Sequence, residues 1–113
     1  MAKQVLLDTN FILTCMKQKI DFFDYLEMEG YIIIIPEQVI NELENLKKES
    51  ALMLLSKSKF KKIKLTGKNV DNAIINYAKE NPELIIATLD RAIQKKIKNR
   101  KMIIRNKKKL EIL

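Results

Sequence analysis

The sequence predicts an α/β fold with three layers, in which helices cover both faces of a central parallel sheet of about five strands. Two observations lead to this prediction. Short runs of β-branched and other apolar residues, such as the run at 31–35, are typical of strands that are buried on both faces. These runs alternate with longer segments whose apolar residues recur every three or four positions, as in amphipathic helices.

Cap and turn residues set the expected limits of the elements. Gly30 is expected to end one helix and Pro36 to begin the next. Ser50 and Asn69 are expected to be helix N-caps. The expected strands are residues 4–8, 31–35, 61–65, 84–87 and 102–104, and the expected helices are residues 21–29, 37–48, 50–59, 70–79 and 90–99.

The chain, residues 1–113, is expected to fold as a single domain. Its 47% hydrophobic residues can build a core, while 32% charged residues keep the surface solvated. The only cysteine, Cys15, has apolar neighbours, which favours a buried structural thiol in a reducing compartment. No secretory signal is visible and no apolar run approaches the ~20 residues of a membrane span, so we expect a cytoplasmic protein without membrane contact.

Missing residue types exclude several classes of enzyme. The chain has no His, which excludes Ser-His-Asp and Cys-His catalysis and, with a single Cys, argues against a zinc site. Its only two glycines are Gly30 and Gly67, so a glycine-rich dinucleotide loop is excluded. Gly67-Lys68 also lacks the remaining residues of a P-loop.

Positive charge is concentrated in the second part of the chain. Residues 1–49 carry five Lys or Arg against nine Asp or Glu, a balance of −4, whereas residues 50–113 carry seventeen against five, a balance of +12. The segments 57–68 and 91–110 hold six and ten basic residues and no acid. Such clusters bind polyanions by displacing counterions from phosphates. A merely solvated, Lys-rich surface has the same composition, so both interpretations stay open.

Four carboxylates are spread over the expected strands and helices. Asp8 ends the first strand and Glu42 lies on the helix after the second, while Asp71 opens the helix after the third. Asp90 follows the fourth strand. Because open parallel sheets bind ligands at the carboxyl ends of their strands, these side chains can converge there. Crowded carboxylates repel each other unless a cation lies among them, and Mg²⁺ or Mn²⁺ prefers carboxylate and water oxygens.

Each acid also has an ordinary structural explanation. Asp71 and Asp90 lie at helix starts, where the helix dipole favours any carboxylate. Glu42 is compatible with a solvated helix surface. Asp8 has few structural uses, because a carboxylate between two apolar runs is costly to bury alone. The metal-site interpretation therefore depends on the combination of the four acids, and above all on Asp8.

The blocks that carry these acids resemble those of PIN-domain nucleases, the family related to the PilT N-terminal domain. In order along the chain they are VLLDTNFIL, IPEQVINELENL, VDNAI, IIATLDRAIQKKI and KMIIRNKKKLEIL. The first four blocks contain Asp8, Glu42, Asp71 and Asp90 at the acidic positions of the family. The resemblance covers most of the chain and is stronger to compact archaeal members similar to ribosomal-RNA-processing PIN endonucleases than to the VapC toxins.

This resemblance implies a PIN-like fold and a Mg²⁺- or Mn²⁺-dependent endoribonuclease that cuts single-stranded RNA. Glu42 would orient the metal-bound water or a second ion, and the other three acids would ligate the metal directly or through water. Asn10 and Thr88 would support these ligands by hydrogen bonds. The basic residues that would hold the RNA backbone are Lys57, Lys59, Lys61, Lys62, Arg91, Lys95, Lys96, Arg105, Lys107, Lys108 and Lys109.

Other functions remain open at this stage. Asn72, a further supporting residue, stands where many relatives carry a second acid, which favours an RNA-binding or assembly domain with a degenerate site. A VapC-like toxin is the alternative within the nuclease class. A haloacid dehalogenase would need an acid where this chain has Asn10. The partners expected besides RNA are a second copy of the chain and either a ribosome-assembly factor or an antitoxin.

Overall fold

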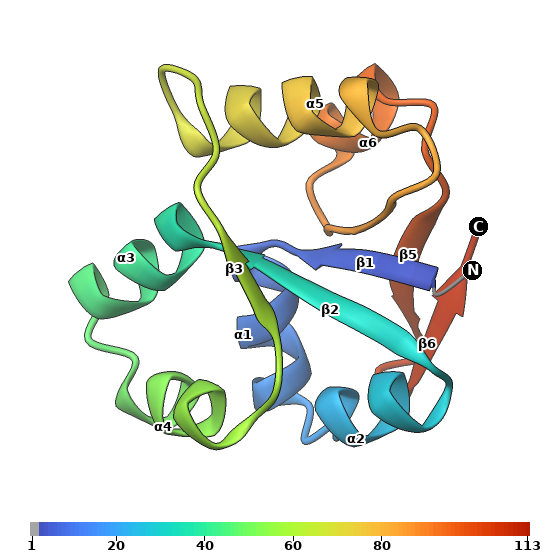
Figure 1. Cartoon of the computed structure of the whole chain (residues 1–113). Helices are drawn as coiled ribbons and strands as arrows, with labels where there is room; N and C mark the ends of the chain where they lie inside the picture. The colour runs from blue at the N-terminus through green and yellow to red at the C-terminus, as the bar shows by residue number, and fades with distance from the viewer. Residues whose placement is uncertain (1–2) are drawn as a thin grey trace.

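The structure is a computed structural model that describes residues 3–113, and its centre is one six-stranded sheet (Figure 1). The strands are β1 (Lys3–Leu7), β2 (Tyr31–Pro36), β3 (Lys61–Ile63), β4 (Ile85–Ala87), β5 (Lys101–Arg105) and β6 (Lys109–Ile112). They lie in the order β3-β2-β1-β4-β5-β6. Neighbouring strands are parallel from β3 to β5, and β6 is antiparallel to β5.

Helices cover both faces of this sheet. They are α1 (Thr9–Lys17), α2 (Phe22–Met28), α3 (Glu37–Asn45), α4 (Glu49–Lys57), α5 (Val70–Glu80) and α6 (Arg91–Lys96). Helices α1 to α4 bury residues such as Phe11 and Leu43 against one face, while α5 and α6 bury Ile74 and Ile93 against the other (Figure 1). The predicted three-layer α/β fold is thus confirmed. Within residues 3–113, every helix is too short or too polar to cross a membrane.

The central strands are apolar along their length because both of their faces are covered. In β1, Val5 and Leu7 belong to the core beneath α1 to α4, whereas Leu6 belongs to the core beneath α5 and α6. All three side chains are fully buried. The continuous apolar runs in the sequence therefore reflect two cores that share one set of strands.

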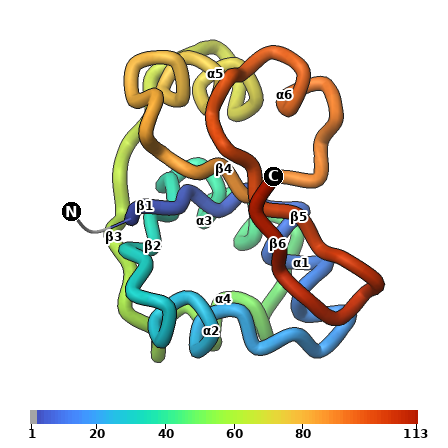
Figure 2. The backbone as a smooth tube through the Cα atoms, turned by 90° about the vertical axis from the view of Figure 1, so that its right-hand side faces the viewer, coloured from blue at the N-terminus to red at the C-terminus, as the bar shows by residue number. Residues whose placement is uncertain are grey.

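The sheet differs from the prediction at its last edge, which has a sixth, antiparallel strand. The N–H of Lys108 donates to the carbonyl of Arg105 at 3.1 Å and closes a turn. Asn106 and Lys107, the central residues, have φ angles of 55° and 59°. Two positive φ angles in succession are the mark of a type I′ turn, whose twist matches that of a β-hairpin. The chain consequently turns back as β6 beside β5 (Figure 2) instead of leaving the sheet as a basic tail.

Several helix limits also differ from the prediction. No helix was expected at 9–17, where α1 begins directly after β1. Helix α4 begins at Glu49, so Ser50 is not its N-cap, whereas Asn69 caps α5 as predicted by accepting from the N–H of Asn72 at 2.8 Å. Helices α3 and α6 end at 45 and 96, earlier than the expected 48 and 99.

The buried thiol in α1 was predicted correctly. Cys15 is fully buried among the side chains that cover β1. Burial raises the pKa of this thiol to about 12, because the thiolate would lose its hydration. Cys15 is therefore an unreactive core residue and not a nucleophile.

The sheet grows in opposite directions from the pair β1 and β4. Strands β2 and β3 are added on one side of β1, and β5 and β6 are added beyond β4. Ligand sites of doubly wound sheets lie at the carboxyl ends of the strands at this switch point. Asp8 directly follows β1 and Thr88 directly follows β4, so both residues lie there.

Candidate active site

Asp8 is buried at the switch point and is held by two hydrogen bonds. Its carboxylate accepts from the N–H of Thr9 at 2.8 Å, which caps α1, and from the hydroxyl of Thr88 at 2.9 Å. Its side chain is 6% exposed. Burial raises the pKa of Asp8, although both hydrogen bonds act in the opposite direction. The expectation that Asp8 has few structural uses was wrong, because it starts a helix and joins two strands.

Thr88 connects Asp8 to the next acid. Its fully buried hydroxyl donates to Asp8 and accepts from the N–H of Asp90 at 3.1 Å. Its carbonyl accepts from the side-chain amide of Gln94 at 2.8 Å. The hydroxyl and the carbonyl of Thr88 are thus held by hydrogen bonds. The fixed hydroxyl in turn orients the carboxylate of Asp8, which follows the neighbouring strand β1. The sequence identified Thr88 as a supporting residue, but it gave no indication of Gln94.

Asp90 is the N-cap of α6. Its Oδ1 accepts from the N–H groups of Ala92 and Ile93 at 2.8 and 3.3 Å. Its Oδ2 makes no hydrogen bond to any residue between 3 and 113, so it is available to a ligand. One carboxylate therefore serves both as a helix cap and as a free oxygen at the site.

Asp71 and Glu42 complete the acidic group, but they are held less firmly. Asp71 lies in the first turn of α5, and Glu42 is exposed on α3. The pKa of Asp71 is raised by burial and then by the charges of Asp90 and Glu42. The charges of Asp71 and Glu42 also raise the pKa of Asp8. The four acids thus share one electrostatic environment, as their positions on the strands and helices predicted.

The loop that leads to Asp71 is anchored to α3. The side-chain amide of Gln38 donates to the carbonyl of Leu65 at 2.6 Å, and its oxygen accepts from the N–H of Leu65 at 3.3 Å. Gly67, with a φ of 148°, lies against α5, where a Cβ atom would come within 3.1 Å of Ala73. These contacts fix the start of α5 relative to α3. The sequence analysis did not identify Gln38, because a side-chain amide that pairs with a distant backbone leaves no local pattern.

The acids fit a hydrated divalent cation better than a closed cage of protein ligands. Among residues 3–113, no three His, Cys, Asp or Glu side chains come close enough to hold one ion. Mg²⁺, however, usually keeps several waters and is bound by one or two carboxylates together with substrate phosphates. The carboxylates supply the oxygen ligands that this ion prefers, and Asp8 and Asp90 are joined through Thr88. The donor set therefore fits Mg²⁺ or Mn²⁺.

The two asparagines make no contact of the expected kind. Asn10 and Asn72 are both exposed, and neither side chain makes a hydrogen bond to the four acids within the described part of the chain. The backbone N–H of Asn72 instead donates to the side chain of Asn69, which is the N-cap of α5. Their supporting roles thus stay predictions.

The predicted RNA-contact residues are distributed over three places. Lys57, Lys59, Lys61 and Lys62 lie at the end of α4 and along β3. Arg91, Lys95 and Lys96 are exposed on α6, the helix capped by Asp90. Lys107, Lys108 and Lys109 lie at the hairpin between β5 and β6. Lys64 and Lys68, which belong to the predicted basic segment 57–68, lie on the loop between β3 and α5 that leads to Asp71.

The hairpin lies away from the acids. Lys108 and Lys109 line a cavity of about 470 Å³ with Lys19 and Asp21, beyond the carboxyl end of α1, whereas Asp8 caps the opposite end of that helix. A nine-residue helix is about 13 Å long. Arg105 is already engaged in a bidentate pair with Glu111, with Nε–Oε2 at 2.7 Å and Nη2–Oε1 at 3.1 Å. The ion pair lowers the pKa of Glu111.

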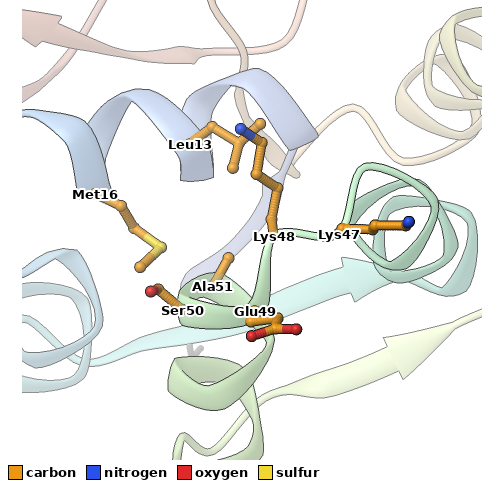
Figure 3. Close-up of a pocket in the computed structure, with 7 residues that line it drawn as sticks. All are labelled: Leu13, Met16, Lys47, Lys48, Glu49, Ser50 and Ala51. Carbon is orange, nitrogen blue, oxygen red and sulfur yellow. The ribbon is translucent and has the colours of Figure 1, made fainter.

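A second cavity, of about 330 Å³, lies between α1 and the turn from α3 to α4 (Figure 3). Leu13 and Met16 of α1 face Ala51, and Lys48 extends beside Leu13 (Figure 3). None of the four acids lines this cavity. The candidate site is therefore the group of acids around the carboxyl ends of β1 and β4.

Comparison with known proteins agrees with this geometry. A family described as a PIN-like domain matches residues 5–109. Ribonuclease VapC4 of Methanocaldococcus jannaschii is 36% identical over 127 aligned positions, which cover 96% of this chain and 95% of that protein. The rRNA-processing protein fcf1 of Schizosaccharomyces pombe is 32% identical over 101 positions that cover 83% of this chain and 53% of that protein, so the chain spans about half of its length.

A solved structure has the same architecture. The structure of the PIN domain endonuclease Utp24 superposes with a TM-score of 0.83 at 28% sequence identity. The superposition covers 96% of this chain and 90% of that structure. The similarity therefore extends from the first strand to the final hairpin region and is not confined to the sheet.

Proposed function

The chain belongs to the PIN-like domain family, and from this premise we propose that it is a metal-dependent endoribonuclease that hydrolyses phosphodiester bonds of single-stranded RNA. The observation that carries the proposal is the pair of acids at the switch point, Asp8 and Asp90, which Thr88 links, with Asp71 and Glu42 near enough for their charges to raise the pKa of Asp8. The similarity to a ribonuclease over almost the whole of both chains supports RNA as the substrate.

The four acids and Thr88 would have different roles in binding the ion. Asp8 and Asp90 would hold Mg²⁺ or Mn²⁺, Thr88 would keep the Asp8 carboxylate in one orientation, and Asp71 with Glu42 would bind water of the hydrated ion. When bound, the ion supplies an activated water and neutralises charge on the scissile phosphate. The protein provides no histidine for proton transfer, so its own contribution is to position these groups.

The RNA backbone would contact the basic residues that adjoin the acids along the chain. Lys64 and Lys68 precede Asp71, and Arg91, Lys95 and Lys96 follow Asp90 along α6. These five cations thus lie before Asp71 or after Asp90 along the chain. Lys outnumbers Arg in both basic segments, which suits contacts with phosphates more than base-specific hydrogen bonds.

Cleavage in the presence and absence of metal tests this function. Purified protein with Mn²⁺ or Mg²⁺ should cut an unstructured, end-labelled RNA, and excess chelator should stop the cleavage. Equal cleavage in chelator would contradict the proposal, because no residue of the chain can replace the ion in activating water.

A second function, RNA binding without cleavage, is favoured by one observation. Within residues 3–113, the acids do not form a ready three-ligand site, and Asn72 provides no carboxylate. This alternative predicts metal-independent RNA binding and intact RNA after long incubation with Mn²⁺. Both results together would replace the nuclease proposal.

The cellular role of the nuclease is proposed as RNA processing, in line with the similarity to fcf1, and a toxin role is the alternative suggested by VapC4. The RNA that co-purifies with an Asp8→Asn variant distinguishes them. Precursor ribosomal RNA supports processing. Enrichment of mature transfer or messenger RNA would favour a toxin.

A further inference from the structure

A groove of about 450 Å³ lies at the edge of the sheet where β2 and β3 diverge. Figure 1 shows the two strands close together at their carboxyl ends and separating toward α2 and α4. The groove is far from the acids in the fold, because it lies at the amino ends of these parallel strands. Its lining residues are Glu27, Tyr31, Ile32, Ile33, Lys59, Phe60 and Lys61.

One side of β2 has no strand partner along this groove. Tyr31, Ile32 and Ile33 pair with β1 on their inner side. On the outer side, pairing with β3 begins only at Ile34, which lies opposite Lys61. Among the described residues, no other strand covers the outer side of 31–33. The backbone groups of this segment therefore present an open edge to which another extended chain can add.

The groove is apolar, and its rings are already in contact with other groups. Ile32 is 39% exposed although it lies in a strand. The Nζ of Lys3 lies 5.3 Å from the centroid of the Tyr31 ring, in a cation–π contact. The Phe60 ring lies 6.5 Å from that of Phe23. Lys3 thus covers one face of the Tyr31 ring and Phe60 packs beside Phe23, so an apolar side chain fits this groove better than a stacked nucleobase.

Lysines surround the open edge and limit what can bind to it. Lys59 and Lys61 line the groove, and Lys57, Lys62 and Lys64 lie on the same segment, against the single acid Glu27. A second copy of the chain would bring identical lysines to the contact, so like charges oppose pairing of two such edges. A segment with acidic residues would instead gain from them.

We propose that this groove binds an extended segment of a partner protein in which apolar and acidic residues alternate. The segment would pair with the backbone of 31–33, place its apolar side chains beside Ile32 and Phe60, and direct its carboxylates toward Lys59 and Lys61. This inference does not depend on nuclease activity, because it uses none of the four acids. In this proposal, Lys59 and Lys61 contact a protein partner and do not contact RNA.

A designed peptide tests the proposal with the full chain. The probe is a fluorescent eight-residue peptide in which Val alternates with Glu, and the controls are the same peptide with Lys in place of Glu and one N-methylated at alternate amides. We expect the acidic peptide to bind, with chemical-shift changes centred on Tyr31, Ile32 and Ile33. The two control peptides should bind at least tenfold more weakly.

Variants of the protein provide matched controls. Ile32→Asp places a repelling charge in the groove and should weaken peptide binding at least tenfold. Met53→Asp makes the same kind of change on α4, where the side chain is 60% exposed, and should leave binding unchanged. Both variants should keep the circular dichroism spectrum of the parent and a cooperative thermal unfolding transition, which shows that they are folded.

Three results would overturn the proposal. The first is failure of the acidic peptide to bind, or equal binding of the Lys-containing peptide. The second is a larger response of residues 31–33 to oligouridylate RNA than to the peptide. The third is a concentration-dependent shift of these residues in the protein alone, which would mean that the edge binds a second copy.

Discussion

The two halves of the acidic site are held in different ways. Asp8 and Asp90 belong to a chain of hydrogen bonds through Thr88, and each also caps a helix. Asp71 and Glu42 are exposed on two helices and influence the other acids mainly through their charge. The first half is therefore fixed by hydrogen bonds of the fold, whereas the Asp71 and Glu42 side chains make no hydrogen bond to any residue between 3 and 113.

This difference leads to unequal effects of substitution. The largest is expected for Asp8→Asn, which keeps the shape of the side chain but removes its charge from the fixed half. RNA cleavage at saturating Mn²⁺ should fall by roughly 100-fold or more, beyond the range of ~10–100 typical for residues that only orient a ligand. Single-turnover cleavage of labelled RNA measures the effect, and a loss below tenfold would mean that Asp8 is not part of the metal site.

Thr88→Val should have the next largest effect, because it removes the hydroxyl that joins the two fixed acids. Cleavage should fall roughly 10–100-fold, with a higher Mn²⁺ concentration needed for half-maximal rate. The N–H of Asp90 also loses its partner, which should cost about 1–3 kcal/mol of stability.

Thr88→Ser is the control for this change, since it restores the hydroxyl. Recovery of both the rate and the Mn²⁺ requirement in Thr88→Ser would support a positioning role. If Thr88→Val lowers stability but leaves the Mn²⁺ requirement unchanged, the hydroxyl is only structural.

A smaller effect is expected for the basic residues, and it compares the loop before Asp71 with the β5–β6 hairpin. RNA affinity should fall with salt, with a log–log slope of about −0.7 per phosphate that is neutralised. The double change of Lys64 and Lys68 to Ala should flatten this slope by about twice that amount. The same change of Lys107 and Lys108 should flatten it less, because the hairpin lies beyond the far end of α1. Equal effects of the two pairs would place the hairpin in the RNA path.

The smallest expected effect is on how the free energy of unfolding of the metal-free protein depends on pH. The folded state raises the pKa of Asp8 above its ordinary value of 3.8, so it binds the proton more tightly than the unfolded chain does. The contribution of Asp8 to stability is therefore most favourable below pH 3.8 and declines as the pH rises through the folded pKa. Melting curves in chelator should show this decline in the parent and less of it in Asp8→Asn; parallel curves would contradict it.

The fold could be predicted because its central strands are continuous apolar runs, which are typical of strands buried on both faces. The grouping of the acids followed from the same logic, since parallel strands bring their carboxyl ends to one edge. The β5–β6 hairpin was missed because its turn uses Asn106 and Lys107, and Lys is not a residue that signals a positive φ.

The hydrogen bonds within the site could not be predicted in the same way. Asp8 and Thr88 are 80 residues apart, and Gln38 and Leu65 are 27 apart. Such pairs depend on strand register and side-chain direction, which appear only once the sheet is assembled. The helix after Asp8 was missed because residues 11–16 were interpreted as one apolar stretch, although the buried residues Phe11, Ile12 and Cys15 have the spacing of one helix face.

Mn²⁺ binding to the intact protein tests most directly whether Asp8 is a metal ligand. Thermal unfolding of the parent and of Asp8→Asn would be compared in chelator and in Mn²⁺. The parent should gain about 2.7 kcal/mol when Mn²⁺ is at 100 times its Kd, and the variant much less, while the variant without metal should melt higher because one desolvated charge is gone. If Asp8→Asn melts lower without metal and keeps the full response to Mn²⁺, Asp8 serves the fold alone and the proposed metal site is wrong.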